Sequence, residues 1–358
     1  MLNYILKKIG YGVLVIFGVV TLVFFLFNIL PGDPARMMLG QRSDKKSVDM
    51  IHRDLGLDRP IGVQYLNYLN DLSFISFYSK QEGSNFYLDT TKYTSFTTLF
   101  QTKTKCVVLK KPYLRRSYQT KRNVSDILME AFPNTIILAI VAIAFAFVVG
   151  VLLGSISSLH PNTKIDRLIQ LITSVGMSLP SFFAAIIIAW LFAFVLSKYT
   201  GLSMFGSLYV VDDLGRGEHL QLKNLILPAI TLGIRPLAVI TELTKATLLD
   251  VYSQDYIRTA RAKGMNNRQI IIHHALKNAL NPVITAVSGW FASLIAGAVF
   301  VEYIFDWKGI GVVIVDSLEK YDFPVIMGAL LVICILLIII NIVTDILYAA
   351  LDPKVRVQ

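Results

Sequence analysis

Long apolar runs separated by short polar segments dominate the sequence. The first unbroken run extends from Ile9 to Leu30, and it is long enough to cross about 30 Å of hydrocarbon as a helix. Later runs have similar length, although one is interrupted near its middle and another contains several ionisable residues. We therefore expect an all-α polytopic membrane protein with six transmembrane helices, at residues 9–30, 134–156, 168–196, 225–248, 283–301 and 325–351.

A polar stretch of about 100 residues separates the first two apolar runs. The sequence PGDP at 31–34 ends the first span and predicts the start of a short helix at the outer surface. Apolar residues then recur at helical spacing around Leu55 and around Leu69, which predicts two short amphipathic helices. Between residues 101 and 122 there are eight Lys or Arg residues and no acid. We interpret that segment as a loop in water or at lipid headgroups.

Basic residues predict the topology. Lys7 and Lys8 precede the first span, and Lys164 and Arg167 lie in the short loop after the second span. Short cytoplasmic loops are enriched in such residues, whereas long loops cross the membrane regardless of charge. Both termini are therefore expected in the cytoplasm, with a large extracytoplasmic loop between spans one and two. The expected domains are an N-terminal span (1–30), an extracytoplasmic region (31–133) and a core domain with spans two to six (134–358).

One strongly charged segment interrupts the apolar second half of the chain. It reads DYIRTARAKGMNNRQIIIHHALKNALNP from residue 255 to residue 282. Ser253 is available as an N-cap, and Gly264 should end the first helix. A second helix can begin at Asn266, with Gln269 at capping-box spacing, and run to Pro282. We call residues 253–282 the charged element. Its small residues and basic side chains suit docking onto another protein, but an ordinary positive cytoplasmic loop is also possible.

Two apolar runs contain residues that are unusual in hydrocarbon. Pro180, in the motif SLPSF, should kink the third span and free backbone carbonyls that must face protein or water. Arg235 and Glu242 lie in the fourth span, where ionisable groups usually face a bundle interior or a cavity. These three residues are candidates for a translocation path, and packing roles remain open for them. Arg235 and Glu242 could also serve a self-contained secondary transporter or channel, although no inverted-repeat signal supports one.

Composition excludes several classes of function. With 54% hydrophobic and 16% charged residues and a mean hydropathy of +0.59, the chain is too apolar for an ordinary soluble protein. The net charge of +10 resides mostly in loops, where anionic lipid explains it, so nucleic-acid binding is not expected. Cys106 and Cys334 lie in unlike segments, so a disulfide between them is not expected.

Candidate chemistry is also missing from the sequence. There is no phosphate-binding glycine loop of the GxxxxGK[ST] type. His273 and His274 are adjacent, so a helix points them to different faces, which disfavours a metal site. No arrangement of nucleophile and base can be argued from the residue order. We expect a non-catalytic membrane subunit that has no cofactor and no metal and is driven by a separate motor.

The chain contains several distinctive short motifs. They are LPGDPA at 30–35, DLGLDRP at 54–60, SLPSF at 178–182, DYIRTARAKG at 255–264, VEYIFDWKGIG at 301–311, YDFPV at 321–325 and LYAALDPKVR at 347–356. Each motif alone is weakly specific, but together and in this order they are very specific. Their order resembles the permease subunit of peptide/nickel-class bacterial ATP-binding-cassette (ABC) importers, and it is most similar to the first of the two permeases in dipeptide or oligopeptide systems.

The resemblance implies the fold of a type I ABC importer permease in the bacterial inner membrane. Its implied partners are a second permease subunit, two ABC ATPase subunits, an extracytoplasmic substrate-binding protein and membrane lipid. Short peptides are the expected cargo, ahead of nickel, sugars or siderophore-like molecules. The segment from 73 to 123 is longer than usual in the family, and Glu242 stands where the family often has Arg.

The resemblance also implies which residues contact the ATPase. The charged element corresponds to the family's EAA loop, with Arg-Thr-Ala at 258–260 in place of the general Glu-Ala-Ala, as in the peptide class. The implied coupling residues are Arg258, Thr259, Ala260, Arg261, Ala262, Lys263, Gly264, His274, Asn278, Ala279 and Pro282.

Overall fold

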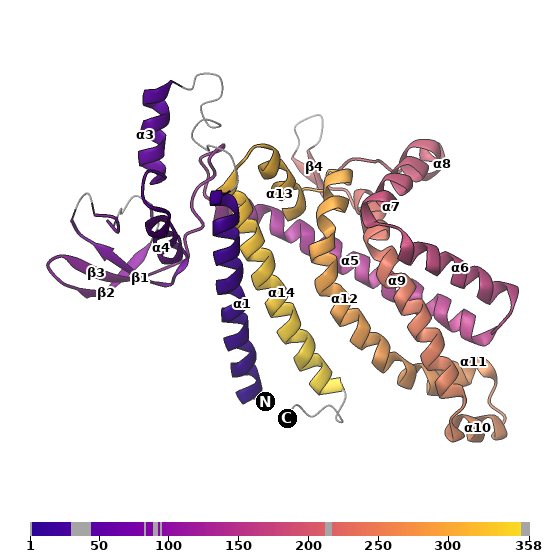
Figure 1. Cartoon of the computed structure of the whole chain (residues 1–358). Helices are drawn as coiled ribbons and strands as arrows, with labels where there is room; N and C mark the ends of the chain where they lie inside the picture. The colour runs from indigo at the N-terminus through magenta and orange to yellow at the C-terminus, as the bar shows by residue number, and fades with distance from the viewer. Residues whose placement is uncertain are drawn as a thin grey trace. The chain divides into compact units, whose positions relative to one another are not determined.

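The computed structural model of the protein describes residues 2–29, 44–81, 84–88, 92–93, 95–211 and 217–351 (Figure 1). Both the predicted short helix at 31–34 and the end of the chain from residue 352 lie outside the described residues. The helices before the core domain are α1 (Leu2–Ile29), α3 (Lys45–Leu55) and α4 (Ile61–Leu72), and the strands are β1 (Ile75–Ser79), β2 (Phe96–Gln101), β3 (Lys105–Lys110), β4 (Tyr209–Val211) and β5 (Glu218–Leu220).

The remaining helices form most of the chain. They are α5 (Val124–Leu159), α6 (Lys164–Ser178), α7 (Ser181–Ile188), η2 (Ala189–Val195), α8 (Ser197–Thr200), α9 (Lys223–Tyr252), α10 (Asp255–Ala262), α11 (Asn267–Ile270), η3 (Ile271–Ala275), α12 (Leu276–Phe305), α13 (Ile310–Glu319) and α14 (Phe323–Leu351). Because α3 and α4 cover the two groups of periodic apolar residues, the prediction of two amphipathic helices is confirmed.

Five helices among the described residues are long and apolar enough to cross a membrane, and a bent pair makes a possible sixth span. The five lie in α1, α5, α9, the continuous helix from Arg268 to Phe305, and α14. Two predicted boundaries are wrong. The helix that contains the second span begins at Val124 and not at residue 134, because Pro133 is accommodated inside α5. Pro282 likewise lies within α12 and does not end it.

The third predicted span is broken rather than merely kinked. Helices α6 and α7 meet at an angle of 115°. Leu179 and Pro180 both have extended backbone, with ψ angles of 130° and 140°. A proline ring disfavours helical backbone in the preceding residue, so Pro180 stops α6 at Ser178 and starts α7 in a new direction.

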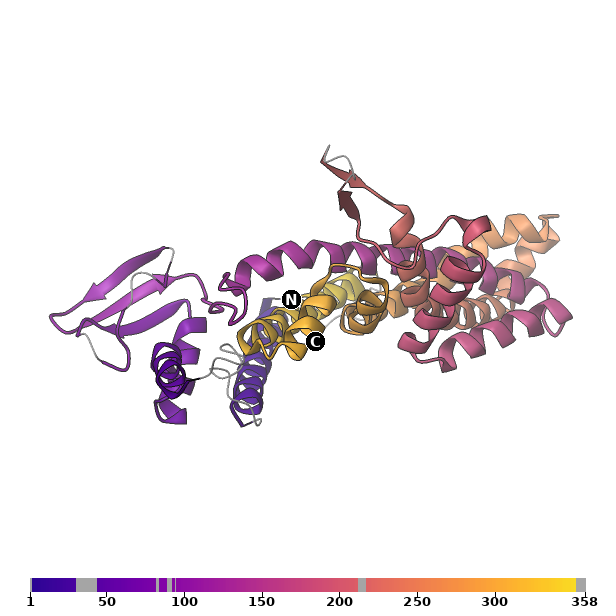
Figure 2. The same cartoon turned by 90° about the horizontal axis from the view of Figure 1, so that it is seen from above.

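Contacts divide the chain into two compact units, which are described separately. The first unit contains residues 1–12, 131–312 and 335–358, and the second contains residues 13–130 and 313–334. In the first unit α9 lies between α12 and α6, and α7 also packs on α9 and α12 (Figure 2). Small residues let helices approach closely here: a Cβ on Gly233 would lie 2.7 Å from the carbonyl oxygen of Ala142 in α5.

The motif DWKGIG forms a buried turn that closes α12 in the first unit. The Trp307 side chain is fully buried, and its Nε1–H donates to the carbonyl of Asn134 over 3.0 Å. The Gly311 N–H donates to the buried Glu302 carboxylate over 2.7 Å. A Cβ at Gly309 would lie 2.4 Å from that carboxylate, so the motif keeps glycine there for packing.

In the second unit the segment predicted as a basic loop contributes β3, the central strand of a three-stranded antiparallel sheet in the order β1-β3-β2. One sheet face is buried and includes Tyr78, Cys106 and Val108. The prediction of a loop is therefore wrong for β3. Alternation in KCVVLK at 105–110 is the strand signal that the count of basic residues obscured.

Some of the basic residues in this segment are partly enclosed. Asp71 accepts hydrogen bonds from Arg115 Nε over 3.1 Å and from the Tyr93 hydroxyl over 3.0 Å. The Lys110 ammonium donates to the carbonyl of Asp71, and burial lowers the pKa of Lys110 although Asp71 opposes the shift. Burial also raises the pKa of Tyr68 to about 12. These contacts tie the sheet to the end of α4.

Candidate functional site

The charged element begins where α9 ends. Ser253 has helical backbone, and its hydroxyl donates to the carbonyl of Asp250 over 2.7 Å. It therefore closes α9, and the prediction that Ser253 caps the next helix is wrong. Gln254 has extended backbone and takes the N-cap position of α10 without a side-chain hydrogen bond. An N-cap residue needs non-helical backbone, which Ser253 does not have.

The turn and the second helix start follow the sequence prediction. Gly264 has a φ of +82°, a left-handed conformation that glycine adopts at little cost, and it follows the last turn of α10. The Asn266 N–H donates to Gln269 Oε1 over 3.1 Å, and the Gln269 N–H donates to Asn266 Oδ1 over 2.9 Å. This reciprocal pair is a capping box, which is confirmed, and it defines the start of α11.

A small apolar core lies inside the charged element. Helix α10 packs on the end of α9 and on α11, η3 and the start of α12, through side chains that are buried. They are Leu248, Ile257, Ala260, Ile270, Ala275 and Ala279. Ala260 and Ala279 therefore face the interior of the element itself, where their small size allows α10 to lie close to its neighbours. The charged element is thus a folded knob and not a flexible loop.

The outward surface of the knob is basic and carries most of the predicted coupling residues. Exposed in this structure are Arg258, Thr259, Arg261, Ala262, Lys263, Gly264, Asn278 and Pro282, whereas His274 is half-buried. The Asn278 amide donates to the Tyr256 hydroxyl over 2.8 Å, which joins the base of α12 to α10. Within the first unit, Figure 1 shows α10 and α11 at one end of α9 and α8 at the other. A projecting knob with exposed positive charge can bind a complementary cleft in another protein.

The three candidate path residues are not gathered into one site. Arg235 and Glu242 lie on the same face of α9 and are exposed, but seven residues of helix separate them by about 10 Å along the axis. No ion pair joins them in the part of the chain that the structure describes. Glu242 lines a hollow of about 320 Å³ together with Gln170 and Lys245, while Pro180 lies at the break between α6 and α7.

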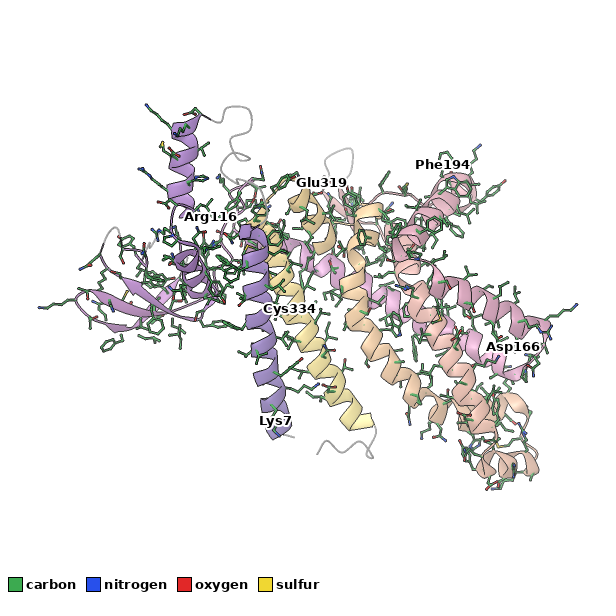
Figure 3. The ribbon with its side chains drawn as sticks, viewed as in Figure 1. Lys7, Arg116, Asp166, Phe194, Glu319 and Cys334 are labelled. Atoms are coloured by element: carbon green, nitrogen blue, oxygen red, sulfur yellow. The ribbon has the colours of Figure 1, made fainter. Side chains whose placement is uncertain are left out.

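An ion pair near the charged element was not recognised from the sequence. Lys245 Nζ lies 2.5 Å from Asp166 Oδ1, and the Asp166 side chain is only 4% exposed. The Ser157 hydroxyl and the Asn162 N–H also donate to this carboxylate. Figure 3 labels Asp166 close to the turn between α5 and α6. The pair joins the ends of α5, α6 and α9, and a lysine within an apolar run was the available signal for it.

Known families match both ends of the chain. Residues 146–357 match the family described as binding-protein-dependent transport system inner membrane component. Residues 1–86 match the family of N-terminal segments of such membrane components.

Individual relatives match over the whole length. The di/tripeptide transport system permease protein DppB of Pseudomonas aeruginosa is 33% identical over 373 residues, with full coverage of both chains. The glutathione transport system permease protein GsiC of Escherichia coli is 32% identical and covers 99% of each chain. Among solved structures, an inward-facing MetNI methionine ABC transporter matches with a TM-score of 0.51 and 18% identity, over 64% of this chain and 97% of that chain. This structural likeness shows a shared fold.

Proposed function

The chain belongs to the family of binding-protein-dependent transport system inner membrane components and is a permease subunit of an ABC importer, and from this we propose that it carries short peptides across the inner membrane. The full-length relatives in Pseudomonas aeruginosa and Escherichia coli are named for di- and tripeptides and for glutathione, which is itself a small peptide. Short peptides are the cargo class that these relatives share.

We also propose that the charged element couples the path to ATPase subunits. Its own apolar core, its glycine turn and its capping box make it rigid. It is continuous with α9 on one side and with α12 on the other, so a displacement of the knob moves two spans. Shifting a gate from 1:99 to 99:1 needs about 5.5 kcal/mol of differential interaction, which a flexible loop could not transmit.

The proposed assembly contains this chain, a second permease, two ATPase subunits and an external binding protein. ATP hydrolysis occurs on the ATPase subunits, and this chain contributes the path and the docking knob. Counting the bent pair as one span gives six spans, an even number, so both termini lie on the same side of the membrane, and we place them in the cytoplasm. The basic charged element then lies on the cytoplasmic side, as the positive-inside rule requires.

The rival function is a self-contained secondary transporter that uses Arg235 and Glu242 as an ionisable pair. The family membership disfavours it. The separation of the two side chains along α9 also disfavours it, because an ion-coupled pair would need contact or a shared cavity. Only Glu242 lines the hollow next to Lys245.

Gentle extraction of the tagged chain from its native membrane, followed by mass spectrometry, tests the assembly. We expect to recover a second six-span permease and two ATPases. Ala262→Asp and Arg261→Glu change exposed positions of the knob, so we expect them to release the ATPases and to leave the second permease bound. Gly264→Pro should have the same effect, because proline cannot adopt the φ of +82° found there.

Lys198→Glu is the matched control, since Lys198 is also exposed in the first unit but lies in α8, at the opposite end of α9. It should retain every partner. Recovery of the chain alone, or as a homo-oligomer, under conditions that preserve other membrane complexes would contradict the importer assembly. Retention of both ATPases by all three knob variants would contradict the coupling role alone.

A further inference from the structure

The three-stranded sheet of the second unit has an open apolar face. Residues that pair across an antiparallel sheet point to the same side, so the register defines this face. Phe77, Val107 and Phe100 form one row across all three strands, and Ile75 and Leu109 lie in the next row. The opposite face contains the buried Tyr78, Cys106 and Val108.

The open face is unusually exposed for its composition. Phe77 and Phe100 are each 65% exposed, Ile75 is 50% exposed and Leu109 is 44% exposed within the described part of the chain. A contiguous apolar patch of this kind marks a contact with another protein, a membrane or a ligand. Its contacts must come from outside the described residues.

Lysines flank the apolar rows at both ends of the central strand. Alternation along β3 puts Lys105, Val107 and Leu109 on the same side, Lys111 follows directly after the strand, and both lysines are exposed. Apolar side chains in the centre with lysines at the ends are typical of surfaces in the membrane interface, where each ammonium reaches the headgroups. Anionic headgroups complement this charge.

The sheet is attached to a helix that packs against a membrane span. In α4, the Tyr65 hydroxyl lies 2.6 Å from the Thr21 hydroxyl of α1, and the Tyr68 ring stacks on Phe24 of α1. The apolar span in α1 ends at Asn28, seven residues after Thr21, so this contact lies about 10 Å below the end of the span. Helix α4 is therefore at the depth of the headgroup and upper acyl region.

The sheet is held firmly at that level. The Asn70 side chain of α4 accepts a hydrogen bond from the Phe77 N–H over 2.9 Å and donates to the Phe77 carbonyl over 3.0 Å. The Ser76 hydroxyl donates to the Asn70 carbonyl over 2.8 Å. These bonds fasten the edge strand β1 to α4, next to the row that contains Phe77.

We propose that the open sheet face is a lipid contact. It inserts Phe77, Phe100, Ile75 and Leu109 into the leaflet at the C-terminal end of α1, and Lys105 and Lys111 bind anionic headgroups there. The sheet is held by α4 next to the span in α1, and lysines flank its apolar face. Both features favour lipid over a protein partner. The contact holds the second unit at the surface of the bilayer independently of the cargo that the importer carries.

Site-directed spin labelling of the full chain in nanodiscs tests this proposal. Labels are placed at Phe77→Cys and Phe100→Cys, with Thr98→Cys as the matched control, because Thr98 is exposed on β2 but faces the other side of the sheet. Cys334 is replaced by Ala, and the buried Cys106 is left in place. Collision rates with oxygen and with a water-soluble nickel chelate report the depth of each label.

In nanodiscs that contain phosphatidylglycerol, we expect labels 77 and 100 to collide more with oxygen than with the chelate, and label 98 to show the reverse. Lys105→Glu with Lys111→Glu should make labels 77 and 100 shallower, and so should nanodiscs of phosphatidylcholine alone. If all three labels collide more with the chelate than with oxygen, the proposal is overturned. A second result would also overturn it. If labels 77 and 100 collide freely with the chelate in the nanodiscs and lose these collisions only when the external binding protein is added, the open face contacts a protein.

Discussion

At the scale of single residues, the clearest energetic feature near the charged element is the Asp166–Lys245 ion pair. A sequence contains no direct sign that an acid in one helix and a lysine 79 residues later will meet. Once they meet, the carboxylate is enclosed, and its partners in the described part of the chain are Lys245, the Ser157 hydroxyl and the Asn162 N–H. Removing one partner of such a pair leaves an uncompensated charge.

We predict that Lys245→Ala lowers the free energy of unfolding by about 3 kcal/mol, the lower end of the range for a buried ion pair, because the Lys245 side chain is still 17% exposed to solvent. Thermal unfolding of the purified chain in detergent measures it. Lys223→Ala, at an exposed position of the same helix, is the control and should change stability by less than about 0.5 kcal/mol. The double variant Asp166→Asn with Lys245→Met should recover part of the loss. Equal stability of Lys245→Ala and Lys223→Ala would contradict a structural role for the pair.

At the scale of elements, the break between α6 and α7 is the feature that the sequence located but did not describe fully. The motif SLPSF predicted a kink, and the structure has a bend of 115° between two separately started helices. The size of the bend depends on packing of α7 against α9 and α12, which no local pattern encodes.

We predict that Pro180→Ala lets α6 continue past Ser178 and populates straighter forms. A bias of ~1 kcal/mol between bent and straight forms changes their ratio roughly fivefold, and we expect uptake to fall by a similar factor. Spin-label distances between Leu171→Cys and Ile187→Cys, both exposed, report the bend. Pro133→Ala is the control, because Pro133 lies inside α5 without breaking it. Unchanged distances and unchanged uptake in Pro180→Ala would show that tertiary packing alone holds the bend.

At the scale of the whole molecule, the chain provides spans and a basic knob, and its sequence has no GxxxxGK[ST] loop. We predict that proteoliposomes containing this chain alone show no gradient-driven uptake of a labelled dipeptide. Proteoliposomes that also contain the second permease, the ATPases, the binding protein and ATP should show uptake. Uptake by the chain alone that is lost on Arg235→Ala would support the secondary-transporter function instead.

Local sequence patterns predicted some elements well because interactions between residues close in the chain determine those elements. The turn at Gly264 and the capping box of Asn266 and Gln269 depend on residues within a few positions of one another. Ser253 was assigned wrongly because its role depends on where α9 ends. The sheet was missed because a run of basic residues was given more weight than the alternation in β3.

The sequence by itself determined that this protein crosses a membrane, where its charged element lies and to which family it belongs, because long apolar runs and ordered short motifs are properties of the chain alone. Only the tertiary structure decided that Ala260 and Ala279 face the inside of the knob, that Asp166 pairs with Lys245, and that one sheet face beside α4 stays open. Each of these depends on which side of an element packs against a distant segment, and such packing is set by contacts between residues far apart in the chain.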